Sequence, residues 1–128
     1  MHNIVMHGIV NYGKRFTLLS PAHDDLVQLR KGVTEFCLLA LIDRAPRHGY
    51  ELVARLAGTR TLALSESTVY PALARLRARG RVRIRVEPSE RGPPRKVFVL
   101  TPAGERRLAE WRDCWEQMHQ DLVELRKG

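Results

Sequence analysis

The segment 65–80 constrains the fold of this chain more than any other stretch. It contains four apolar residues at the i, i+3, i+4, i+7 spacing of one helix face: Val69, Ala72, Leu73 and Leu76. This spacing predicts a helix with a single apolar side. A hydroxyl group at Ser65 or Ser67 can cap its first turn, and Gly80 suits the left-handed position at which many helices end. We therefore expect one amphipathic helix whose other residues face outward.

The residues after this helix predict a β-hairpin. Valine and isoleucine alternate with arginine over 82–86, which is the period of a strand, and 96–100 is a second β-rich run. Between them, 88–95 holds three prolines, a serine and a glycine, a composition typical of turns. The hairpin follows directly on the helix, so the two are expected to pack together.

Two further helices are expected upstream. The run 33–42 is apolar on nearly all sides, which predicts a helix buried either in a core or at a subunit interface. A shorter helix is expected over 48–57. Four of its side chains are available for packing: Tyr50, Val53, Ala54 and Leu56. This helix, a turn and the helix at 65–80 make a helix-turn-helix, and the hairpin supplies the wing. The predicted fold class is mainly α with a small β-hairpin, a winged helix-turn-helix followed by a long C-terminal helix.

The last helix, opened by Thr101 as cap, has the clearest periodicity in the chain. Its apolar residues step by three and four, the a and d spacing of a coiled coil: Leu108, Trp111, Trp115, Met118, Leu122 and Leu125. A small winged-helix core cannot cover so long a stripe, so we expect a homodimer, with Phe36 also at its interface. Packing within one subunit is the alternative. Trp111 and Trp115 are interpreted as dimer core or, alternatively, as walls of a pocket for a small aromatic or apolar effector.

The charge distribution favours a nucleic-acid partner. The chain has 22 Lys and Arg against 14 Asp and Glu, a net charge of +8. Residues 65–100 hold nine basic and three acidic residues, so +6 of this charge lies in that segment. Such a region attracts polyphosphate by releasing condensed counterions, although a solvated face is the alternative. The candidate DNA-binding residues are His48, Ser65, Ser67, Thr68, Tyr70, Arg75, Arg79, Arg83, Arg91, Arg95 and Lys96.

Different roles are expected within this set. Ser67, Thr68 and Arg75 are the candidates for base edges, and contact with phosphate is the alternative for each. Tyr70 can reach a phosphate with its hydroxyl or belong to the core. Arg91 or Arg95, near the hairpin tip, is expected to contact phosphate or the minor groove.

Length and composition exclude several classes of protein. With 128 residues the chain has room for one modest core. The expected division is an N-terminal arm of unassigned role (1–22), a DNA-binding domain (23–100) and a dimerisation helix (101–128). No apolar run is long enough for a membrane span and no secretory signal is evident, so a cytoplasmic location is expected. Cys37 and Cys114 are expected to be buried without a metal or redox role. No catalytic constellation, cofactor loop or metal-ligand spacing is evident, so an enzyme is not expected.

Residues 31–104 resemble the PadR (phenolic-acid-decarboxylase-regulator) family of bacterial transcription regulators. The motifs that carry the resemblance are LLALI at 38–42, HGYEL at 48–52, STVYPAL at 67–73, GPPRK at 92–96 and LTPAG at 100–104. The family commonly has glycine at the position of Ser67, and the last helix is of the short kind. The resemblance implies a homodimeric repressor that a small molecule or a stress signal releases. With two-fold symmetry its operator is expected to be an inverted repeat. A winged-helix protein-interaction module without operator specificity is the alternative function.

Overall fold

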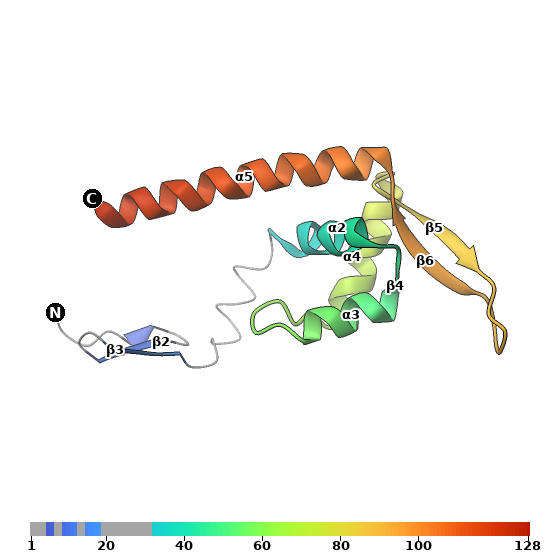
Figure 1. Cartoon of the computed structure of the whole chain (residues 1–128), viewed down its shortest axis with the longest axis horizontal. Coiled ribbons are helices and arrows are strands. Elements are labelled where there is room, and N and C mark those ends of the chain that lie inside the picture. Colours follow the sequence, from blue (N-terminus) through green and yellow to red (C-terminus); the bar gives the residue numbers. More distant parts are fainter. Residues whose placement is uncertain (1–4, 7–8, 13–14, 19–31) are drawn as a thin grey trace.

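The winged helix-turn-helix expected from the sequence is present. The computed structural model describes residues 5–6, 9–12, 15–18 and 32–128. From residue 32 onward the elements follow in the order α2 (Thr34–Arg44), β4 (Arg47–His48), α3 (Gly49–Ala57), α4 (Glu66–Ala78), β5 (Val82–Glu87), β6 (Arg95–Leu100) and α5 (Pro102–Lys127) (Figure 1). Helices α2, α3 and α4 form a compact group, the hairpin projects from one end of it, and α5 runs along one side.

The apolar face of α4 is the centre of the core. Its four predicted residues, Val69, Ala72, Leu73 and Leu76, have at most 1% of their surface exposed. They pack with buried residues of the neighbouring elements: Leu38, Leu39 and Ile42 of α2, Leu52 and Leu56 of α3, Val82 of β5 and Leu108 of α5. Because α4 packs on one face only, its opposite face is left open to a partner.

The two ends of α4 confirm one expected cap and correct the other. Gly80 has a φ of 72°, and Arg81 donates its amide to the Leu76 carbonyl at 2.9 Å, so the helix ends in a left-handed glycine turn. Ser65 is the residue before the first turn, but its hydroxyl caps no backbone amide. It lies 2.8 Å from the Ser67 hydroxyl instead. The predicted side-chain cap is therefore wrong, because the two hydroxyl groups bond each other.

The wing is a three-stranded antiparallel sheet in the order β4–β6–β5. The register pairs Val82 with Leu100 and Glu87 with Arg95. Strand β4, which the sequence did not predict, pairs His48 with Val97 and so ties the start of α3 to the wing. Thr101 caps α5 as expected by accepting from the Gly104 amide at 3.0 Å, and its hydroxyl donates to the Gly80 carbonyl at 2.6 Å.

The structure differs from the expected burial at three places. Tyr50 is 58% exposed and Ala54 is also exposed, because α3 turns Leu52 and Leu56 toward the core. Within the protomer, the run 33–42 is buried along one side and half-buried elsewhere, as at Phe36 and Cys37, so its burial at a subunit interface stays a prediction. Cys114 is exposed on α5, whereas burial raises the pKa of the half-buried Cys37 thiol.

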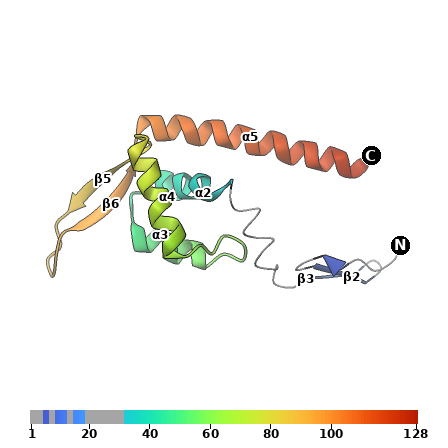
Figure 2. The same cartoon turned by 180° about the vertical axis from the view of Figure 1, so that it is seen from behind.

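Helix α5 is covered only over its first third. Leu108 is buried in the core, and Trp111 packs edge-on against Phe36 of α2 with ring centres 6.0 Å apart. Beyond that point the helix extends past α2, as both views show (Figures 1 and 2). The rest of the predicted stripe is exposed, by 46% at Trp115, 56% at Met118, 57% at Leu122 and 75% at Leu125.

A small antiparallel sheet lies within the predicted N-terminal arm. It consists of β1 (Val5–Met6), β2 (Ile9–Tyr12) and β3 (Arg15–Leu18), with β2 in the centre. These strands are not among the elements expected from the sequence. The boundary predicted at residues 22 and 23 lies outside the described residues. Within the described ranges, no helix has both the length and the apolarity needed to cross a bilayer.

Candidate nucleic-acid interface

The start of α4 presents a cluster of exposed hydroxyl groups. The hydroxyl of Ser65 lies 2.8 Å from that of Ser67 and 3.3 Å from that of Thr68. All three residues are exposed, whereas the buried stripe of α4 begins only at Val69. Hydroxyl groups donate and accept hydrogen bonds, and the threonine methyl can pack on a thymine methyl. This end of α4 is therefore suited to base edges in a major groove.

A pocket of about 550 Å³ lies where α3, α4 and the wing meet. Its lining combines two tyrosines, a histidine and two cations: Tyr50, Tyr70, His48, Arg95 and Lys96, with Gly49, Ile84 and Phe98 completing it. The rings of His48 and Tyr50 stack in parallel with centres 5.6 Å apart, and His48 Nδ1 lies 3.3 Å from the Lys96 carbonyl oxygen. The pocket thus brings together four of the predicted DNA-binding residues.

Gly49 makes this arrangement possible. A Cβ atom on Gly49 would lie 2.6 Å from Cε1 of Tyr70, so only glycine lets the tyrosine ring cross the start of α3. No side chain caps this helix start, because His48 makes no capping hydrogen bond. The free amides of a first turn carry partial positive charge and attract anions. With Arg95 and Lys96 beside it, the pocket has the positive charge that attracts an anion such as a phosphate group.

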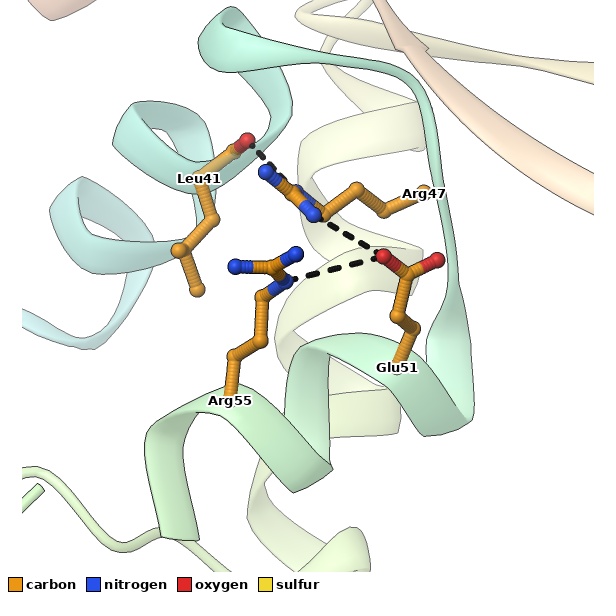
Figure 3. A network of polar contacts seen from close by, with 4 residues as sticks. All are labelled: Leu41, Arg47, Glu51 and Arg55. Carbon is orange, nitrogen blue, oxygen red and sulfur yellow. Dashed lines mark hydrogen bonds and ion pairs between the residues drawn. The ribbon is translucent and has the colours of Figure 1, made fainter. Parts of the chain in front are cut away.

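A buried arginine fixes α3 relative to α2, and so fixes the pocket (Figure 3). Only 7% of Arg47 is exposed. It donates from Nε to the Leu41 carbonyl at 3.1 Å and from Nη1 to Glu51 Oε2 at 2.9 Å, and Arg55 Nε lies 3.6 Å from the same carboxylate oxygen. The hydrogen bond from Arg47 holds the pKa of Glu51 below its usual value. Sequence reasoning missed Arg47, although its spacing of four residues from Glu51 is a usable signal.

Most of the predicted wing cations are exposed. Arg83, Arg91 and Arg95 are exposed on the hairpin. Arg85 is instead paired with Glu87, with Nη2 and Oε1 2.7 Å apart. The predicted wing contacts are therefore accessible, but they lie on a different element from the α4 hydroxyl groups.

Arg75 and Arg79 lie away from the hydroxyl groups at the start of α4, and neither lines the pocket. Arg75 Nε lies 3.4 Å from Oε1 of Glu35, and Arg79 Nη1 lies 3.7 Å from Oε2 of the same carboxylate. Both arginines thus face α2. At 1.5 Å per residue, Arg75 stands about 12 Å along the axis from Ser67. The base contact expected for Arg75 stays a prediction, and this pairing disfavours it.

A second cleft, of about 660 Å³, lies between the start of α2, the turn after α3 and the middle of α5. Its lining is almost entirely apolar: Gly32, Val33, Phe36, Thr61, Leu62, Trp111, Cys114, Trp115, Met118 and Leu122. Both tryptophans named as pocket candidates line it. Arg107 lies over the Trp111 ring, with its guanidinium carbon 4.8 Å from the ring centre.

The fold and this surface define a winged helix-turn-helix protein of the kind that binds duplex DNA. A family model described as the transcriptional regulator PadR-like family matches residues 38–110, which is more than half of the chain. The chain belongs to this family of transcriptional regulators. No curated protein sequence matches it significantly.

Solved structures of similar proteins agree with this assignment. A PadR-like transcriptional regulator from Bacillus cereus is 31% identical, with a TM-score of 0.71, over 79% of this chain and 98% of that chain. A Streptococcus transcriptional regulator is 35% identical, with a TM-score of 0.69, over 77% and 97%. Bacillus subtilis PadR, solved in complex with operator DNA, shares the fold at 22% identity and a TM-score of 0.58, over 62% and 46%.

Proposed function

We propose that this protein is a homodimeric, sequence-specific repressor that binds an inverted-repeat operator. The observation that carries the proposal is the juxtaposition of exposed hydroxyl groups at the start of α4 with the basic, tyrosine-lined pocket beside it. One surface can read bases and the other can hold the backbone. In this arrangement Ser67 and Thr68 face base edges, and His48, Tyr70 and Lys96 hold a phosphate.

The exposed stripe on α5 supports the dimer. Tryptophan, methionine and leucine side chains that remain about half exposed cost free energy in water, and a second copy of the same helix would cover them. A closed two-fold dimer presents two α4 helices, so its half-sites are expected about one helical turn apart.

The apolar cleft supports release by a small effector. It is lined by two tryptophans and by Phe36, and flat aromatic walls suit a planar apolar ligand. It also adjoins the proposed dimer seam, because Met118 and Leu122 belong to both. A ligand there can alter the spacing of the two α4 helices.

The test is a titration of fluorescent duplexes with the wild type, the double variant Ser67→Ala/Thr68→Val, and Ser89→Ala as control. Ser89 also bears a hydroxyl, but it lies in the wing turn and donates to the Arg91 carbonyl. The duplexes are an operator selected by the wild type and a scrambled version of it. The double variant should lose about 10-fold or more on the operator and little on the scramble, because each lost base contact costs about 1–3 kcal/mol.

Two results would contradict the proposal. Equal losses on both duplexes would make the hydroxyl groups phosphate contacts. Absence of duplex binding by the wild type would favour the alternative, a winged helix that binds another protein.

A further inference from the structure

Glu35 is the one charged residue in the largely apolar run 33–42, and its side chain is mostly withdrawn from water. Its side chain is only 15% exposed, although it lies in the first turn of α2, where solvent is close. A carboxylate withdrawn from water is retained where cations compensate it. Two arginines of another helix compensate this one, so the contact joins α2 to α4.

Glu35 contacts two arginines at once. The two carboxylate oxygens of Glu35 engage different arginines, Arg75 at 3.4 Å and Arg79 at 3.7 Å. These arginines are four residues apart on α4, a spacing at which like charges repel. Glu35 therefore neutralises a repulsive pair and draws both side chains toward α2. Each arginine remains more than half exposed, so the contact can be exchanged for another anion.

In the proposed binding mode, with the first turn of α4 in a major groove, the later turns would approach the DNA backbone. The helix has 13 residues and is about 20 Å long, whereas a major groove is about 12 Å wide. Side chains two to three turns after Ser67 then lie near flanking phosphates rather than base edges. Arg75 and Arg79, if released, are long enough to bind those phosphates.

We propose that Glu35 is a positioning residue that sets specificity by holding Arg75 and Arg79 away from phosphates. The proposal rests on the DNA-binding function proposed above. A chain of net charge +8 binds any duplex through its cations, and every extra phosphate contact strengthens operator and random DNA alike. By occupying two arginines, Glu35 lowers the sequence-independent part of the affinity for DNA. The contacts at the start of α4 then determine how strongly the protein prefers its operator to random DNA.

The experiment compares Glu35→Gln with Asp43→Asn on a random-sequence duplex across a range of salt concentrations. Asp43 is the matched control, because it is the other acidic residue of α2 and pairs with Arg112 of α5, at 3.4 Å, rather than with α4. Both variants remove one negative charge from the protein, so its long-range electrostatic attraction to the duplex rises equally in both. Glu35→Gln alone should also bind about two- to fivefold more tightly than the control. Its slope of log affinity against log salt should be steeper by about 1–2 per protomer.

A second comparison keeps the proposal testable if Glu35→Gln fails to fold. With Glu35 in place, Arg75→Gln/Arg79→Gln should bind random duplex no more weakly than Arg106→Gln/Arg126→Gln, which removes two exposed cations of α5. A selective loss for the α4 pair would overturn the proposal, as would a Glu35→Gln slope equal to or shallower than that of Asp43→Asn. Failure of the wild type and of Asp43→Asn to bind any duplex would instead refute the DNA-binding function itself.

Discussion

Replacement of Leu122 by alanine should weaken dimerisation while leaving each protomer folded. Leu122 is 57% exposed in the isolated protomer and lies on the apolar stripe of α5. Full burial of a leucine side chain is worth about 1.5–3 kcal/mol, so covering the exposed part contributes roughly 0.9–1.7 kcal/mol per copy. In a two-fold dimer the substitution removes the Leu122 contact from both protomers. The dimer dissociation constant should therefore rise roughly 20- to 300-fold.

Sedimentation velocity over a nanomolar to micromolar range measures this constant directly. Gln120→Ala is the matched control, because it truncates a side chain of the same helix two residues away, on a different side from Leu122. The control should dimerise as the wild type does, and the melting temperatures of dilute protein should agree among all three. A Leu122→Ala protein that dimerises as tightly as the control would refute the assignment of the stripe, and so would a wild type that is monomeric at micromolar concentration.

Three further outcomes are expected. Affinity for duplex DNA should fall about 10³-fold or more between 50 and 200 mM salt if a dimer engages roughly 6–10 phosphates, and a flat response in filter binding would exclude backbone contact. Arg47→Met should lower the free energy of urea unfolding by about 1–3 kcal/mol, because the Leu41 carbonyl and Glu51 lose their buried partner. Arg55→Met, which removes the exposed partner of the same carboxylate, should cost at most about 1 kcal/mol. Because the pKa of Glu51 is lowered in the fold, its contribution is present above the unfolded pKa and is lost as pH falls through the folded one. Wild type should therefore lose stability more steeply than Glu51→Gln below about pH 5, and parallel curves would contradict this.

Local patterns predicted much of the fold correctly. The stripe from Val69 to Leu76 is buried, the alternation over 82–86 forms β5, and Thr101 caps α5. Each of these features depends on spacing within one element, which the sequence shows directly. The same reasoning predicted that the hydroxyl groups of α4 and the cations of the wing are exposed. Side chains that lie off the apolar face of a helix or strand point toward solvent.

Features that depend on two elements were missed. Which side of α3 is buried is decided by α4, so Leu52 rather than Tyr50 enters the core. In the sequence Arg47 is only an isolated cation, and its buried position depends on contacts with the Leu41 carbonyl of α2 and with Glu51 of α3. The pairing of Arg75 with Glu35 joins residues forty positions apart, which no local pattern encodes. A charged residue within an apolar run is nevertheless a signal that a partner must be found.

The strands of the N-terminal sheet were also missed, although the sequence carries a signal for them. Short runs rich in Val, Ile, Phe and Thr at 9–12 and 15–18 are separated by two residues that include a glycine, a spacing typical of hairpins. The runs are only four residues long, so their composition alone does not distinguish them from a loop.

Selection of bound sequences from a random duplex library with the purified full chain tests the central claim most directly. At physiological salt the wild type should enrich an inverted repeat whose half-sites lie about one helical turn, roughly 34–36 Å, apart. Parallel selection with Ser67→Ala/Thr68→Val should enrich a more degenerate repeat at the same spacing, because base contacts are lost while the dimer persists. Recovery of no enriched sequence by the wild type, or of a single half-site without a symmetric mate, would contradict a dimer that reads DNA through two α4 helices.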